Sequence, residues 1–76
     1  MKTTVGNIVR RERKVRGLTQ QELGELARTG LNFVSQLERG KETVRFDKLL
    51  DVLKVLGLEF VLTRGHNKLS VAKELT

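Results

Sequence analysis

Residues 18–41, "LTQQELGELARTGLNFVSQLERGK", decide the fold of this chain. Within them, "TQQE" at residues 19–22 is a capping box, in which the Glu22 side chain reaches back to the Thr19 amide and starts a helix. The apolar stripe of this helix consists of Leu23, Leu26 and Ala27. The pattern predicts a helix that ends near Arg28.

The segment "RTG" at residues 28–30 is too short for anything but a tight turn. A third helix is predicted from about Leu31 to Arg39, and Gly40 ends it. Its core side consists of Phe33, Val34 and Leu37. Two short helices joined by a three-residue turn form a helix-turn-helix unit. Glycine inside a helix costs about 1 kcal/mol relative to alanine, so Gly24 predicts a close crossing of the two helices.

Two further helices flank this unit. The first is predicted from about Thr4 to Arg16, with most of its bases on one side and Gly17 as its C-terminal cap. Its apolar side consists of Val5, Ile8, Val9 and Val15. The other runs from about Phe46 to Leu56, and Gly57 caps it. Its apolar stripe is wider than a surface helix requires, which predicts one face buried against the domain and one against a partner.

Residues 58–64, "LEFVLTR", alternate with the period of a strand. No second strand is evident elsewhere, and a strand's backbone groups need a neighbour. We therefore expect pairing with the same strand of another copy across a two-fold axis. The residues expected at this dimer contact are Leu58, Phe60, Val61 and Leu62. The alternative is a fifth helix or an ordered tail. The domain is thus predicted over 1–64, followed by a weakly periodic C-terminal tail, 65–76.

The composition indicates one small domain with a polyanionic partner. Fifteen Lys and Arg against nine Asp and Glu give a net charge of +6, which favours a nucleic-acid partner. The alternative is a basic surface that has no binding role. The 76 residues include no cysteine, so no disulfide supports the core and a homodimer is expected. No apolar run approaches the roughly 20 residues of a membrane span, and no secretory h-region is visible. A cytoplasmic, nucleoid-associated location is the expectation.

The segments "LTQQELGELA" and "VSQLERGK" resemble the Xre/Cro/phage-repressor helix-turn-helix family over roughly residues 5–57. The resemblance implies a compact all-α, four- to five-helix, lambda-repressor-like domain. The wording "GLNFVSQLERGK" followed by "LLDVLKVLGLE" is similar to HipB-like antitoxins, the DNA-binding partners of HipA-type serine/threonine kinases. That subfamily ends in a short strand that pairs across the dimer. The chain departs from the family at the turn, where Arg28 replaces the usual glycine and Thr29 the usual small aliphatic residue.

In such a unit the third helix enters the major groove, and its outward side chains meet base edges. The expected base-reading residues are Leu31, Asn32, Ser35, Gln36 and Arg39. Asparagine and glutamine pair bidentately with adenine, and Leu31 suits a thymine methyl group. The expected contacts to the DNA backbone are Gln20, Gln21, Arg28, Gly30, Lys41 and Arg45. The alternative for Asn32, Ser35 and Gln36 is a merely solvated face. Glu38 is expected to pair internally with an arginine. The basic side chains of the first helix are expected to supply only long-range attraction to DNA.

These observations predict a homodimeric, sequence-specific transcriptional repressor on a palindromic operator. The subfamily resemblance implies the antitoxin of a HipA-type kinase toxin–antitoxin system that autoregulates its operon. The alternatives are a stand-alone phage-type or metabolic repressor, and a pure protein-interaction module. Catalysis is not expected, because His66 is the single histidine and no metal-ligand spacing is present; no cofactor is implied.

Overall fold

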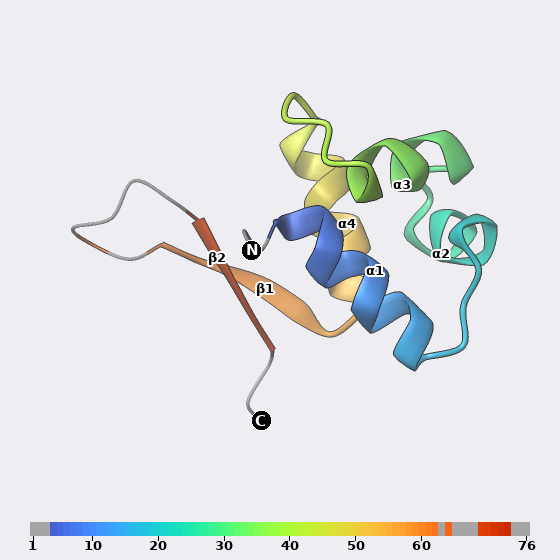
Figure 1. Ribbon diagram of the computed structural model, residues 1–76, viewed down its shortest axis with the longest axis horizontal. Helices are drawn as coiled ribbons and strands as arrows, with labels where there is room; N and C mark the ends of the chain where they lie inside the picture. The colour runs from blue at the N-terminus through green and yellow to red at the C-terminus, as the bar shows by residue number, and fades with distance from the viewer. Residues whose placement is uncertain (1–3, 63, 65–68, 74–76) are drawn as a thin grey trace.

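The computed structural model describes residues 4–62, 64 and 69–73. In chain order the elements are α1 (Val5–Val15), α2 (Gln20–Ala27), α3 (Leu31–Glu38), α4 (Phe46–Val55), β1 (Leu58–Leu62) and β2 (Leu69–Lys73). The four helices form one packed cluster, and the two strands project from it as a ribbon (Figure 1). The four predicted helices are confirmed to within about one residue at each end.

Local capping explains where the helices begin. The Thr19 hydroxyl accepts from the Glu22 amide at 3.0 Å, and the Glu22 carboxylate accepts from the Thr19 amide at 2.8 Å. Both bonds of the predicted capping box are therefore present, and they satisfy two amides that lack helical partners. The Thr4 hydroxyl caps α1 in the same way by accepting from the Asn7 amide at 3.1 Å.

The core lies between the four helices and the first residue of β1. Its buried apolar side chains are Val9, Leu23, Ala27, Val34, Leu37, Leu49, Val52, Leu53, Leu56 and Leu58. Phe33 is half-buried and packs against this core. Two residues assigned to apolar stripes lie outside it, since Val15 is 74% exposed and Leu26 is 59% exposed. Both lie on the sides of their helices that no neighbouring helix covers.

The buried side of α1 differs from the predicted one. It consists of Gly6, Val9, Glu12 and Arg13. Arg13 is therefore buried, whereas the other basic side chains of α1 face solvent. Arg13 lies seven residues, or about two turns, after Gly6 and therefore shares its side of the helix. A charged side chain is accepted in this position because it makes three hydrogen bonds there, two of them to a carboxylate.

Two helix crossings depend on glycine. A Cβ atom at Gly24 would lie 2.5 Å from the Gly30 carbonyl carbon and oxygen, so the predicted close crossing of α2 and the start of α3 is confirmed. At Gly6 an added Cβ would fall on the Leu37 carbonyl oxygen and lie 3.1 Å from the Glu38 Cα. The backbone of α1 therefore lies directly against the last turn of α3.

The strand prediction is confirmed for Leu58–Leu62, and the fifth-helix alternative is wrong. The expectation that the chain holds no second strand is also wrong, because β2 pairs with β1 antiparallel, from Leu58 opposite Lys73 to Leu62 opposite Leu69. Residues 69–73 had been assigned to the tail, since "LSVAK" is too short and too weakly alternating to identify. The other residues of that tail fall outside the described part. In the described residues, the sheet has two strands and each keeps one unpaired edge.

Candidate nucleic-acid interface

The turn between α2 and α3 is built from three residues and one carbonyl. The Thr29 and Gly30 amides both donate to the Gly24 carbonyl, at 2.9 and 3.1 Å. Arg28 is left-handed, with φ 59° and ψ 34°, at a position where only glycine avoids a steric cost of about 1 kcal/mol. Gly30 follows with φ 91° as the N-cap of α3. Leu31 is therefore the first residue of that helix.

Two sides of α3 have different surroundings. Val34 and Leu37 are buried, as predicted, and Phe33 packs beneath the Lys48 ammonium, which lies 5.9 Å from the ring centroid. The opposite side carries the predicted base-reading residues. Leu31, Asn32, Gln36 and Arg39 are exposed, whereas Ser35 is half-buried. The structure thus gathers the five predicted base-reading residues on the side of α3 that faces away from the core.

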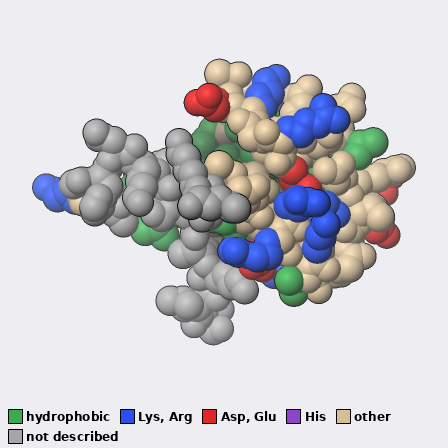
Figure 2. All heavy atoms as spheres, in the orientation of Figure 1, with side chains coloured by type: hydrophobic (Ala, Val, Ile, Leu, Met, Phe, Trp, Pro, Cys, Tyr) green, Lys and Arg blue, Asp and Glu red, His purple; other side chains and the backbone are tan. Residues whose placement is uncertain are grey.

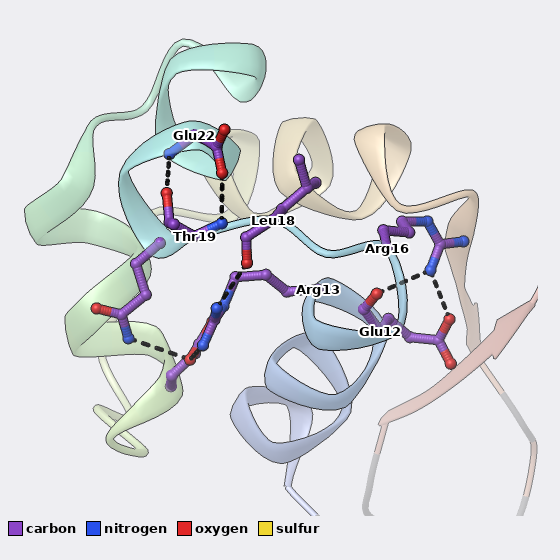
Figure 3. A network of polar contacts seen from close by, with 8 residues as sticks. Glu12, Arg13, Arg16, Leu18, Thr19 and Glu22 are labelled. Atoms are coloured by element: carbon purple, nitrogen blue, oxygen red, sulfur yellow. Dashed lines mark hydrogen bonds and ion pairs between the residues drawn. The ribbon is translucent and has the colours of Figure 1, made fainter.

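A buried ion pair holds the end of α3. Arg13 donates from Nε to Glu38 Oε2 at 2.7 Å and from a terminal nitrogen to Glu38 Oε1 at 3.0 Å. The two side chains are 10% and 3% exposed. The other Arg13 terminal nitrogen donates to the Leu18 carbonyl at 2.8 Å, beside the Thr19–Glu22 capping box (Figure 3). The pair confirms that Glu38 binds an arginine internally.

The hydrogen bonds to Glu38 raise the pKa of the Arg13 guanidinium above its usual value. Gln20 joins the same cluster, since its side-chain amide donates to Glu38 Oε1 at 3.1 Å. One carboxylate therefore connects α1, the start of α2 and the end of α3. Sequence reasoning assigned no such role to Arg13, although its helical position beside Gly6 and Val9 was a usable signal.

The predicted backbone-contact residues lie around the ends of α3. Gln20 and Gln21 open α2, Arg28 and Gly30 precede α3, and Lys41 follows it. All of these are exposed except Gln20, which is half-buried. The Lys41 ammonium lies 3.2 Å from the Gln36 side-chain oxygen. Figure 2 shows Lys and Arg side chains over α1 and over the segment between α3 and α4 on one face of the molecule.

Arg45, the remaining predicted backbone contact, is already paired. It donates to both carboxylate oxygens of Asp47, at 3.1 and 2.7 Å. Hydrogen bonding from Arg45 lowers the pKa of the Asp47 carboxyl below its usual value. Both side chains are exposed, so the pair is a weak one that a phosphate can replace.

The four predicted dimerisation residues have different surroundings. Leu58 is buried in the core and is not available to a partner. Val61 is exposed and lies on the opposite side of β1 from Phe60. Phe60 is half-buried and stacks on Phe46 of α4, with 5.2 Å between ring centroids. Leu62 is 79% exposed and shares the Phe60 side of β1. We call the exposed or half-buried set Phe46, Leu50, Phe60 and Leu62 the α4–β1 apolar surface.

Neither a metal site nor a membrane span is found in the described part of the chain. No three or more His, Cys, Asp or Glu side chains there lie close enough to hold an ion. No helix among residues 4–62 has the length and apolarity required to cross a bilayer.

Comparisons with known proteins agree with this geometry. A family model described as "Helix-turn-helix" matches residues 9–62, from the middle of α1 to the end of β1. The chain is also 45% identical, over 65 residues, to a protein of Sinorhizobium fredii (strain NBRC 101917 / NGR234) described as the uncharacterized HTH-type transcriptional regulator y4mF. That alignment covers 84% of this chain and 86% of the relative. The chain belongs to the helix-turn-helix family.

Proposed function

We propose that this chain is a sequence-specific DNA-binding transcriptional repressor that reads the major groove with α3. The observation that carries the proposal is the division of α3 into a buried side and a polar, exposed side. Asn32 and Gln36 on the exposed side have amides suited to adenine. The Sinorhizobium relative, described as a transcriptional regulator, supports the same class of function.

The rest of the unit suits contacts to the phosphate backbone. The amino-terminal end of α2 carries the positive end of a helix dipole and exposes Gln21 there. Gly30 has no side chain, which lets backbone and DNA approach closely where α3 begins. Lys41 and Arg28 add positive charge after and before the reading helix. We propose that these groups set the orientation of α3 in the groove.

We propose that the repressor is a homodimer that uses the α4–β1 apolar surface and the unpaired edge of β1. The exposure of Phe46 and Leu62 supports this, because monomeric proteins seldom leave such an apolar strip uncovered. The strand edge offers backbone donors and acceptors to an identical strand. Two reading helices about 34 Å apart then match a palindromic operator.

We further propose that the chain is the antitoxin of a HipA-type kinase and represses its own operon. The support is the resemblance of "GLNFVSQLERGK" and "LLDVLKVLGLE" to HipB-like antitoxins. We expect a kinase gene beside the gene for this chain, and we expect the kinase to co-purify with the chain. The second candidate is a stand-alone phage-type or metabolic repressor. The absence of a kinase gene from the genomic neighbourhood would favour this second candidate.

Footprinting on the DNA upstream of the gene tests the repressor proposal. We expect a protected palindrome, and lower preference for it over random duplex in the Asn32→Ala and Gln36→Ala variants. Asn7→Ala removes an exposed asparagine from α1 and serves as the control. Each lost bidentate contact should cost about 1–3 kcal/mol of discrimination. Unchanged preference in both α3 variants, with the helical circular dichroism spectrum intact, contradicts the assignment.

Sedimentation analysis tests the dimer. Phe60→Asp should convert dimer to monomer, because it places a charge in the apolar contact. Leu62→Asp repeats the test at a side chain that takes no part in the core, so a folding defect is not expected. Leu26→Asp, an exposed leucine on α2, is the matched control. A dimer that persists in both β1 variants rules out this surface as the main contact.

A further inference from the structure

A row of exposed side chains, three of them cationic, runs along the solvent side of α1. Asn7, Arg10, Arg11 and Lys14 are exposed and follow the i, i+3, i+4, i+7 spacing of one helical face. In the described part of the chain, Arg10, Arg11 and Lys14 have neither an ion pair nor a side-chain hydrogen bond. By contrast, Arg13 and Arg16 of the same helix are each bound to a carboxylate.

The packing of α1 distinguishes the members of this row. Gly6 and Arg13 contact Leu37 and Glu38, so the side of α1 that carries them faces the end of α3. At about 100° per residue, Arg10 lies about 60° around the helix from Arg13, whereas Arg11 lies about 160° from it. Arg10 also lies between Gly6 and Arg13 along the helix. These angles put Arg10 on the side of α1 nearer to the end of α3, and Arg11 on the side that faces away from it.

The end of α3 is where exposed positive charge already gathers. Arg39 caps α3 and Lys41 follows, both exposed, and Glu38 does not offset them because Arg13 neutralises it. Arg10 adds a cation from a different helix, on the side of α1 nearer to the same turn. Phosphates line both sides of a major groove, so an unpaired cation beside a reading helix faces the backbone rather than a base.

We infer that Arg10 contacts a DNA phosphate beside the end of α3, and that Arg11, its neighbour in sequence, does not. This inference rests on the proposed function, because it requires α3 to enter the major groove. It changes the role of α1 from long-range attraction to direct contact at one position. Phosphate contacts from three segments of the chain would then hold α3 in the groove. These segments are α1, the start of α2 and the α3–α4 segment.

The experiment compares Arg10→Gln with Arg11→Gln, two exposed arginines on one helix that lose the same charge. Binding to a duplex from the gene's own upstream region is measured by fluorescence anisotropy between 50 and 200 mM salt, the interval over which phosphate contacts change affinity strongly. Each lost contact should flatten the slope of log affinity against log salt by about 0.9. Over that interval, the ratio of wild-type to Arg10→Gln affinity should change about 3.5-fold per contact. Arg11→Gln should keep the wild-type slope.

Two further variants complete the design. Arg10→Lys keeps the positive charge and should keep the wild-type slope. Lys54→Gln removes an exposed cation from α4 and is the control for the loss of net charge. Equal slopes for wild type and Arg10→Gln overturn the inference while leaving the repressor proposal intact. Equal flattening in Arg10→Gln, Arg11→Gln and Lys54→Gln also overturns it, because net charge alone then explains the effect. Failure of the wild type to bind any duplex contradicts the proposed function itself, and with it this inference.

Discussion

Glu38→Gln is the substitution that tests the tertiary arrangement most directly. The Glu38 carboxylate accepts three hydrogen bonds, two from Arg13 and one from Gln20, and its side chain is 3% exposed. Glutamine has nearly the same shape but only one acceptor oxygen. Its amide nitrogen would face an Arg13 or Gln20 donor, and the Arg13 cation would remain buried without its counter-charge.

The expected loss is large for a protein of this size. Removing one partner of a buried ion pair costs about 3–5 kcal/mol. At roughly 0.05–0.15 kcal/mol per residue, a chain of 76 residues has an unfolding free energy of about 4–11 kcal/mol. We expect Glu38→Gln to lower it by about 3 kcal/mol. With a urea dependence of about 1 kcal/mol per molar, the unfolding midpoint should fall by about 3 M.

Urea unfolding followed by far-ultraviolet circular dichroism measures this loss, because the chain has neither tryptophan nor tyrosine as a fluorescent reporter. Glu42→Gln changes an exposed glutamate just after α3 and should stay within about 0.5 kcal/mol of wild type. Arg13→Met combined with Glu38→Leu removes both charges and should recover much of the loss. A loss below about 1 kcal/mol in Glu38→Gln, or one equal to that of Glu42→Gln, would refute the reasoning.

Three further predictions concern the turn before α3 and the start of α4. The Thr29 hydroxyl is buried without a hydrogen-bond partner among the described residues, so Thr29→Val should raise the unfolding free energy by about 1 kcal/mol. Thermal unfolding measures this change, and a decrease in the unfolding free energy of about 1 kcal/mol would show that the hydroxyl has a partner. Arg28→Gly should raise stability by up to about 1 kcal/mol, by relieving the left-handed backbone, yet weaken DNA binding; unchanged affinity would remove Arg28 from the phosphate contacts. Asp47→Asn frees the Arg45 guanidinium, so the slope of log affinity for DNA against log salt should become steeper by about 0.9. An unchanged slope would show that Arg45 reaches no phosphate.

Much of the helical unit follows from local sequence. The capping box at Thr19 and Glu22, the glycines after α1, α3 and α4, and the 3.6-residue periodicity define four helices close to their observed bounds. Local rules are sufficient because caps and turns involve residues only a few positions apart. The inward side of α3 was predicted for the same reason, since Val34 and Leu37 repeat at a helical spacing.

The errors concern contacts between distant segments. Val15 and Leu26 fit their helical stripes but are exposed, because periodicity gives the direction of a side chain and not the neighbour that covers it. β2 was missed because a short strand is identified mainly by its partner, and β1 was predicted to find that partner in another copy. A domain of 76 residues covers only part of each helix, so such errors are frequent at its margins.

The sequence by itself determined which helices form, where the turn lies, and which α3 residues face away from the apolar stripe. Tertiary structure alone decided that Arg13 is buried against Glu38 and that Gly6 lies on the backbone of α3. The physical reason is range. Helix caps and side-chain periodicity act within one or two turns, whereas the roles of these α1 residues depend on how α1 crosses a helix 25 residues further along the chain.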